Sequence, residues 1–114
     1  MITAIIFDLD NTLLDFVKMK RFAVRAAVTA MNEAGLGVDE KKAFDDIFDL
    51  YLNKGWEHQQ VFDDYLQQTT GKVSNKVLAA GIVSYRRARE ATLLVYPNVN
   101  KTLIELLKMG IKLA

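Results

Sequence analysis

The apolar run at residues 2–7 constrains the fold most, because it has no helical period and stops abruptly at an acidic residue. Its sequence, ITAIIF, is rich in β-branched residues and is followed directly by Asp8. A short continuous apolar run of this kind suits a strand that is covered on both faces, as in a parallel sheet. We therefore expect the chain to open with a buried strand of an α/β fold.

From Asp15 onward the apolar residues recur every three or four positions, which is typical of amphipathic helices. Four such stripes are separated by short loops that contain glycine, and Asp39 and Ser74 are expected to cap the second and fourth helices. Gly81 interrupts the fourth stripe. Four short-linked amphipathic helices predict a small helical bundle. The last three stripes, expected to face its core, comprise Phe44, Ile47, Phe48, Tyr51, Leu52, Val61, Phe62, Tyr65, Leu66, Thr69, Val77, Leu78, Ile82, Tyr85 and Ala88.

After Pro97, the one proline, the pattern changes to a further helix and the start of a second strand. The inward residues expected for this helix are Val99, Leu103, Leu106 and Leu107, with Gly110 after its end. This order predicts an α/β fold, namely the N-terminal part of a Rossmann-like parallel-sheet core with an inserted four-helix bundle. The expected divisions are 1–14 for the core strand and its loop, 15–91 for the helical insertion and 92–114 for the return to the core, with the crossover helix and the start of the second strand.

Composition excludes several classes of function. Fifteen Lys and Arg against fourteen Asp and Glu give a net charge of +1, so charge supplies no reason to expect nucleic acid or a membrane surface as partner. The absence of cysteine excludes disulfides, thiolate metal sites and thiol nucleophiles. The apolar runs are too short to cross a bilayer, and Asp8 interrupts the N-terminal run before it could act as a signal peptide. We expect a soluble cytoplasmic protein.

Asp8 and Asp10 are the residues most able to carry chemistry. Side chains two apart on a strand point the same way, and open α/β sheets bind ligands at the carboxyl ends of their strands. Two neighbouring carboxylates repel, so one tends to stay ionised as nucleophile or metal ligand while the other can hold a proton. A hard cation such as Mg²⁺ would relieve the repulsion. The alternative is a turn role alone, because Asp commonly bonds local backbone where a strand ends.

The segment F-D-L-D-N-T-L, from residue 7, resembles the first motif of the haloacid dehalogenase-like (HAD) hydrolases. That motif is Asp-x-Asp-x-Thr-Leu or Asp-x-Asp-x-Thr-Val after an apolar strand, and it is matched by Asp8, Asp10, Thr12 and Leu13. The helical insertion is similar to the cap that this family carries after the first motif. The segment YPNVNKTLIELLKMGIKLA is similar to the one that follows the cap, usually Tyr-Pro-Gly-Val, a Leu-rich helix, Gly and a strand. The resemblance spans essentially the whole chain.

The resemblance implies a role for each matching residue. Asp8 would be the nucleophile that attacks phosphorus to form a phosphoaspartyl intermediate, and its other oxygen would bind Mg²⁺. Asp10 would protonate the leaving group, then deprotonate the hydrolytic water, and its carbonyl would be a second Mg²⁺ ligand. Thr12 would steady the loop and help to position Asp10. The implied function is an Mg²⁺-dependent phosphohydrolase acting on a small phosphorylated metabolite, and Asp10 favours this over dehalogenation, which needs no proton donor.

The resemblance also implies that the loop between the second and third cap helices faces the active site. Lys54 or His58 could then contact an anionic group of the substrate, and Trp56 could shield the site from water. The alternatives are an ordinary packed tryptophan and solvated basic side chains. The basic residues soon after the motif are expected to be solvated helix charges rather than phosphate ligands: Lys18, Lys20 and Arg21.

The family pattern requires a Ser or Thr at the end of the next strand, a later Lys or Arg, and further acidic metal ligands, none of which is matched here. We therefore expect the 114 residues to be the N-terminal part of a longer phosphatase and to lack substantial activity alone. Unpaired strand edges would favour a homo-oligomer or association with a complementary fragment. Two alternatives stay open: a non-catalytic fragment or helical interaction module that assembles with another chain, and a phosphomutase, which would share Asp8 and Asp10.

Overall fold

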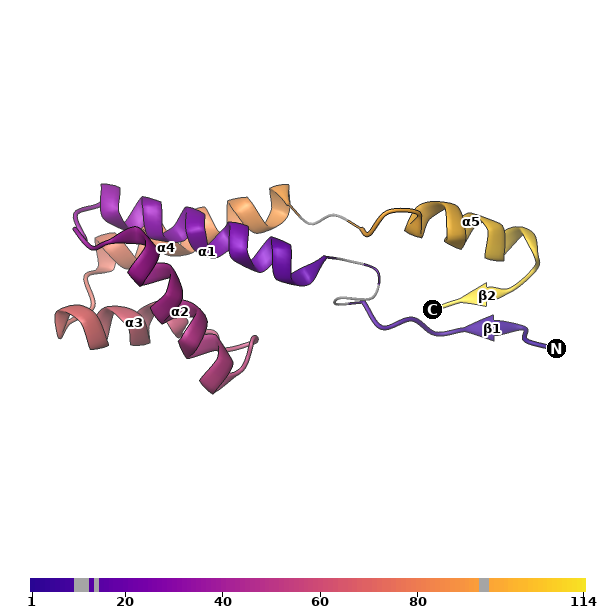
Figure 1. Cartoon of the computed structure of the whole chain (residues 1–114), viewed down its shortest axis with the longest axis horizontal. Helices are drawn as coiled ribbons and strands as arrows, with labels where there is room; N and C mark the ends of the chain where they lie inside the picture. Colours follow the sequence, from indigo (N-terminus) through magenta and orange to yellow (C-terminus); the bar gives the residue numbers. More distant parts are fainter. Residues whose placement is uncertain (10–12, 14, 93–94) are drawn as a thin grey trace.

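The computed structural model describes residues 1–9, 13, 15–92 and 95–114. Within these residues, two short strands, one near each end of the chain, enclose five helices in the sequence (Figure 1). The elements are β1 (Ala4–Ile5), α1 (Phe16–Glu33), α2 (Glu40–Lys54), α3 (Val61–Thr70), α4 (Asn75–Ala91), α5 (Val99–Lys108) and β2 (Lys112–Leu113). Among the described residues, no helix is both long and apolar enough to cross a membrane.

Aspartate side chains cap the N-termini of the first two helices. The Asp15 carboxylate accepts a hydrogen bond from the Lys18 amide at 3.2 Å, and Asp39 accepts one from the Lys42 amide at 2.9 Å. The predicted cap at Asp39 is therefore confirmed, because its side chain satisfies an amide that has no partner within the helix. Ser74 also occupies the N-cap position of α4, but its side chain makes no capping bond, so that part of the prediction is wrong.

The core of the bundle is built from the apolar stripes of α1–α4. Residues on all four helices are buried there, including Val24, Ala27, Val28, Met31, Ile47, Tyr51, Val61, Phe62, Tyr65, Leu66 and Val77. The expected inward position of Leu52 is wrong: its side chain is 66% exposed, and Leu50 is buried instead. Leu52 is exposed because its side chain lies roughly 140° around the axis of α2 from that of Ile47, which is fully buried. Thr69, at the end of α3, is likewise exposed.

Gly81 has a packing role in α4. It is buried against α1, and a Cβ atom at this position would lie 2.9 Å from both Cγ and Sδ of Met31. Met31 is itself fully buried. A glycine within the fourth stripe therefore lets α4 approach α1 closely enough to cover Met31.

The strands pair in parallel, with Ala4 opposite Lys112 and Ile5 opposite Leu113. The hydrogen-bond pattern extends to the amide of Phe7, which donates to the carbonyl of Ala114 at 2.8 Å. Parallel pairing agrees with the predicted α/β class. The Rossmann-like core and the role of the bundle as a cap stay predictions.

The expected burial of the first strand and of α5 is wrong for this structure. Ile6 is 85% exposed, Leu107 is 58% exposed, and no residue of α5 is buried. Among the described elements, β1 packs against β2 alone and α5 against β2 alone. The apolar side chains of β1 and α5 thus have no second layer to cover them.

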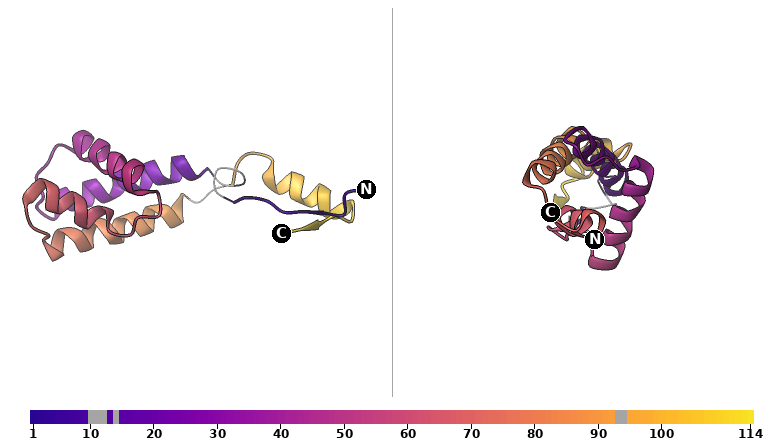
Figure 2. Two further views of the ribbon diagram at one scale, coloured as in Figure 1. Left: turned by 90° about the horizontal axis from the view of Figure 1, so that it is seen from below. Right: turned by 90° about the vertical axis from the view of Figure 1, so that its left-hand side faces the viewer.

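The molecule is elongated, measuring 59 × 24 × 21 Å along its principal axes. Its radius of gyration is 18.2 Å, against the roughly 13 Å typical of a compact domain of this length. Figures 1 and 2 show why: the bundle of α1–α4 lies at one end, and α5 with the two strands lies at the other. The segments that connect these parts meet where the Tyr96 amide donates to the Leu13 carbonyl at 2.8 Å.

The contact between α1 and α4 generates a first prediction. Gly81→Ala should destabilise the bundle, because overpacking against Met31 costs about 1–3 kcal/mol while the gain in helix propensity is only about 1 kcal/mol. In a Met31→Ala background the same substitution should stabilise, since the crowding atoms are gone. Urea denaturation of the two single variants and the double variant measures this coupling. Equal effects of Gly81→Ala in both backgrounds would contradict it.

Candidate active site

Asp8 lies at the carboxyl end of β1, directly after the last hydrogen bond to the β2 segment. Its side chain is exposed, and its Oδ1 accepts a hydrogen bond from the Leu9 amide at 3.0 Å. That bond is the local contact expected of an aspartate at the end of a strand, and it also orients the carboxylate. The position therefore suits a nucleophile at the carboxyl end of a parallel strand. The hydrogen bond from the Leu9 amide would be equally expected of an aspartate that only stabilises a turn.

Asp10 and Thr12 lie outside the described residues, so their predicted roles stay predictions. The described residues on either side of them are joined, because the Leu13 amide donates to the Leu9 carbonyl at 3.1 Å. Through Leu13, the same segment is hydrogen-bonded to Tyr96, which precedes α5. Leu13, at the end of the motif, is thus held to the part of the chain that returns from the bundle.

A magnesium ion requires several oxygen ligands, of which Asp8 can supply one. Its carboxylate is a hard donor of the kind that Mg²⁺ prefers. Within the described part of the chain, no group of three or more His, Asp or Glu side chains gathers that could hold a metal ion. Asp8 therefore fits magnesium by donor chemistry, and the complete ligand set stays a prediction.

The structure brings Lys54 and His58 together, but on a carboxylate of α3. The Lys54 ammonium lies 2.7 Å from Oδ2 of Asp64, and Nε2 of His58 lies 2.6 Å from the same oxygen. The hydrogen bond from Lys54, followed by that from His58, holds the pKa of the Asp64 carboxyl below its ordinary value. Both predicted substrate contacts are thus engaged within the protein, and their binding role stays a prediction.

Trp56 packs within an aromatic cluster at one end of the bundle. Its ring is stacked on Tyr51, with centroids 5.8 Å apart, and meets the edges or faces of Phe16 at 6.0 Å and Phe48 at 5.8 Å. Phe16 is the first residue of α1. The α2–α3 loop therefore lies at the end of the bundle from which the chain leads back to Asp8 (Figure 1).

Lys20 is the residue whose environment the sequence interpretation missed. Lys18 and Arg21 are exposed as expected, but Lys20 is only 5% exposed. Its ammonium donates to the Tyr85 hydroxyl at 2.7 Å and to the Trp56 carbonyl at 3.0 Å. The helical period of the sequence could have indicated this burial. Lys20 lies four residues after Phe16 and three before the buried Ala23, on the apolar stripe of α1.

The ammonium of Lys20 also faces the ring of Tyr51, whose centroid lies 4.0 Å away. Burial raises the pKa of the Tyr51 hydroxyl well above its ordinary value, and the neighbouring Tyr85 adds to the shift. The Tyr51 hydroxyl therefore stays neutral at physiological pH. Neutral hydroxyl and carbonyl groups, rather than a carboxylate, meet this buried cation.

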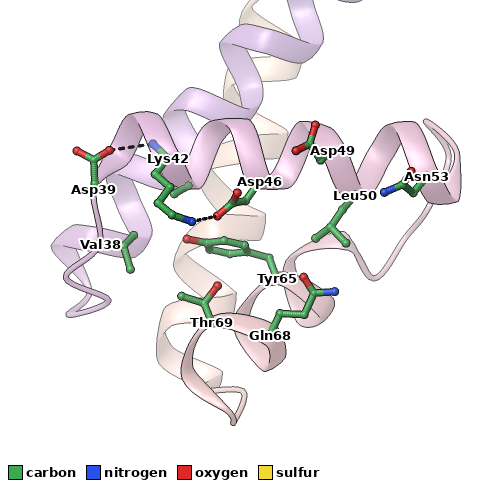
Figure 3. A pocket seen from close by; sticks show the side chains of 11 residues that line it. Val38, Asp39, Lys42, Asp46, Asp49, Leu50, Asn53, Tyr65, Gln68 and Thr69 are labelled. Carbon is green, nitrogen blue, oxygen red and sulfur yellow. Dashed lines mark hydrogen bonds and ion pairs between the residues drawn. The ribbon is translucent and has the colours of Figure 1, made fainter.

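Two hollows in the bundle differ in the residues that line them. One of about 480 Å³ is lined by Lys20, Trp56, His58 and Tyr85, at the end of the bundle just described. Another of about 720 Å³ lies between α2 and α3 and carries Asp46 and Asp49 (Figure 3). There, Lys42 is paired with Asp46 at 2.9 Å (Figure 3). Only the first hollow is bordered by residues that the sequence interpretation placed near a substrate.

Comparison with known proteins decides the family. The model of the haloacid dehalogenase-like hydrolases matches residues 2–114. The chain belongs to this family. It is 38% identical over 113 residues to a glyceraldehyde 3-phosphate phosphatase of Methanocaldococcus jannaschii and 36% identical over 115 residues to one of Methanopyrus kandleri. These matches cover 99% of this chain and 50% and 49% of the relatives.

A third relative, a glyceraldehyde 3-phosphate phosphatase of Pyrococcus abyssi, is 34% identical over 113 residues. The match covers 99% of this chain and 48% of that protein. The HAD chain thus spans about half the length of the curated relatives it matches. The family resemblance inferred from the first motif is confirmed.

The cluster around Asp64 generates a prediction about acid stability. Because the folded pKa of Asp64 lies below its ordinary value of 3.8, its ionised form stabilises the fold above that pH, and the contribution is lost as the pH falls through the folded pKa. Asp64→Asn should remove this contribution, so the variant should lose less stability than the parent as the pH falls below about 4. Urea midpoints measured from pH 6 down to pH 2 test this.

Asp63→Asn is the matched control, since Asp63 stands beside Asp64 in the first turn of α3. It should keep the acid sensitivity of the parent chain. If Asp64→Asn and Asp63→Asn follow the same pH profile, the pairing with Lys54 and His58 does not contribute to stability.

Proposed function

We propose that the protein containing this chain is an Mg²⁺-dependent phosphatase that acts on a small phosphorylated metabolite with Asp8 as nucleophile. The observation that carries the proposal is the position of Asp8 at the carboxyl end of β1, directly after its last bond to a parallel strand. Ligands of open α/β sheets bind at the carboxyl ends of the strands. Membership of the HAD hydrolases and the phosphatase names of the relatives support the same reaction.

In the proposed reaction, a carboxylate oxygen of Asp8 attacks phosphorus, and the bond from phosphorus to the leaving oxygen breaks. Asp10 gives its proton to that oxygen as the alcohol leaves. Asp10 then takes a proton from water, whose oxygen attacks the phosphoaspartyl group and releases inorganic phosphate and Asp8. The hydrogen bond from the Leu9 amide would hold the Asp8 carboxylate in a fixed orientation throughout.

Asp8, through its carboxylate, and Asp10, through its backbone carbonyl, would hold the metal ion. When bound, Mg²⁺ would supply positive charge against the phosphoryl oxygens, which is the main requirement of phosphoryl transfer. Thr12 would support the position of Asp10. These assignments rest on the match of the first motif and on the donor chemistry of Asp8.

A three-carbon phosphate ester is the first substrate to test. The relatives are named for glyceraldehyde 3-phosphate, and they are 34–38% identical to this chain over nearly its whole length. We propose this compound or a phosphorylated metabolite of similar size. A phosphomutase would return an isomeric phosphate ester instead of free phosphate, so analysis of the products separates the two reactions.

We further propose that α1–α4 act as a cap over the site, with divisions at residues 1–14, 15–91 and 92–114. The separation of the bundle from the strands supports this, together with the meeting of both connecting segments at Leu13 and Tyr96. A cap placed on two adjacent connections can cover a bound phosphate and exclude water. Lys54, Trp56 and His58 would then lie on the covering side.

Asp8→Asn provides the decisive test. The substitution keeps the shape of the side chain but removes its nucleophilic charge, so kcat should fall by about 10⁴-fold or more. Release of inorganic phosphate from glyceraldehyde 3-phosphate and a panel of phosphorylated metabolites is measured in the protein that carries residues 1–114. The same assay with EDTA in place of Mg²⁺ should also lose activity.

Asp15→Asn is the control, because asparagine can still cap α1 and Asp15 has no proposed catalytic role. Its activity should match that of the parent. Full activity of Asp8→Asn, or no turnover of any phosphate ester by the parent protein, would contradict the proposed function.

A further inference from the structure

We propose that Lys20 is a positioning residue that anchors the α2–α3 loop, residues 55–60, to α1 and α4. Building on the proposed phosphatase function, we infer that this anchoring sets the affinity for substrate. The juxtaposition is specific: one buried ammonium bonds the backbone of the loop at Trp56 and the side chain of Tyr85 on α4.

The contacts of Lys20 join separate parts of the bundle. Lys20 belongs to α1, its carbonyl acceptor at 3.0 Å belongs to Trp56 in the loop, and its hydroxyl acceptor at 2.7 Å belongs to Tyr85 on α4. The ring centroid of Tyr51, on α2, lies 4.0 Å from the ammonium. Apolar packing supplies most of the contact between these elements, and the bonds from Lys20 add a directional tie between α1, α4 and the loop.

The charge of Lys20 makes this tie strong. Among the described residues, no carboxylate lies within ion-pair distance of the ammonium. A buried charge is tolerated only when its donors are satisfied, and here the acceptors are neutral oxygens and aromatic faces. Loss of the Trp56 carbonyl would leave a buried N–H of a cation without an acceptor. The loop is therefore held in the position that keeps this bond.

An apolar residue at this position could fill the same space but could not hold a carbonyl. The ring of Trp56 packs against Phe16 and Tyr51. This packing keeps the side chain within the aromatic cluster, but an apolar contact does not fix its exact position. The hydrogen bond to the Trp56 carbonyl fixes the backbone of the loop instead. These contacts of Trp56, together with the bond between His58 and Asp64, define where residues 55–60 lie.

The anchored loop borders the hollow of about 480 Å³, because Trp56 and His58 are among its lining residues. Lys20, Trp56 and His58 all line this hollow, and its wall also carries the charged side chains of Arg86, Arg89, Glu57 and Glu90. Movement of the loop would change the shape of this wall. In the proposed enzyme, that change would weaken substrate binding more than it would slow the chemical step at Asp8.

Fluorescence of Trp56 reads the anchoring directly, because it is the one tryptophan in the 114-residue chain. Lys20→Met should shift the emission of Trp56 to longer wavelength and increase its quenching by acrylamide, while far-UV circular dichroism keeps its helical signal. Lys20→Arg, which retains charge and donors, should restore part of the parental signal. Lys18→Met, an exposed lysine on the same helix, should leave the emission unchanged.

Tyr85→Phe provides a second variant in case Lys20→Met does not fold. It removes only the hydroxyl acceptor and keeps the ring, so it should give a smaller shift in the same direction. Folded Lys20→Met with unchanged Trp56 emission and quenching would overturn the proposal. If Lys20→Met does not fold, unchanged emission and quenching in Tyr85→Phe would do the same.

Kinetics test the consequence for substrate. Loss of a charge-assisted hydrogen bond that holds the loop should raise KM about tenfold with little change in kcat. A fall in kcat at constant KM would overturn the inferred effect on affinity. If the parent protein hydrolyses no phosphate ester, the proposed function fails, whereas the fluorescence of the 114-residue chain still decides whether Lys20 anchors the loop.

Discussion

Parallel pairing of β1 with β2 is the constraint on which the arrangement of the whole chain depends. It places Ala4 beside Lys112, although nearly the entire sequence lies between them. The intervening chain must leave β1 at its carboxyl end and return to the beginning of β2 through α5. The bond between Leu13 and Tyr96 joins the outgoing and returning segments. The bundle can therefore extend away from the strands while both of its connections stay close to Asp8.

Within the bundle, apolar packing determines the outline and a few polar contacts determine the details. Met31 fits against Gly81, which brings α1 and α4 together along their length. At the end of the bundle near the connections, Lys20 adds directional bonds to Tyr85 and Trp56. Apolar contacts are not directional, so they specify which faces meet, whereas hydrogen bonds donated by a buried cation specify where a loop lies.

The two parts of the molecule also differ in how completely they bury apolar surface. The bundle encloses its own core, but the side chains of Ile6, directly after β1, and of Ile104 and Leu107 on α5 stay exposed. The chain covers about half the length of its HAD relatives. The proposed anchoring of the α2–α3 loop involves residues of the bundle alone.

The sequence by itself determined the order of elements, the Asp39 cap and the HAD family, because hydrophobic period, capping chemistry and a motif of adjacent residues are local properties. It also located Asp8 at the end of a strand. Only the tertiary structure decided that the Lys20 ammonium meets Trp56 and Tyr85 and that Asp64 holds both Lys54 and His58. Such outcomes depend on which groups from distant segments meet, and periodicity specifies a face of a helix without naming its partners.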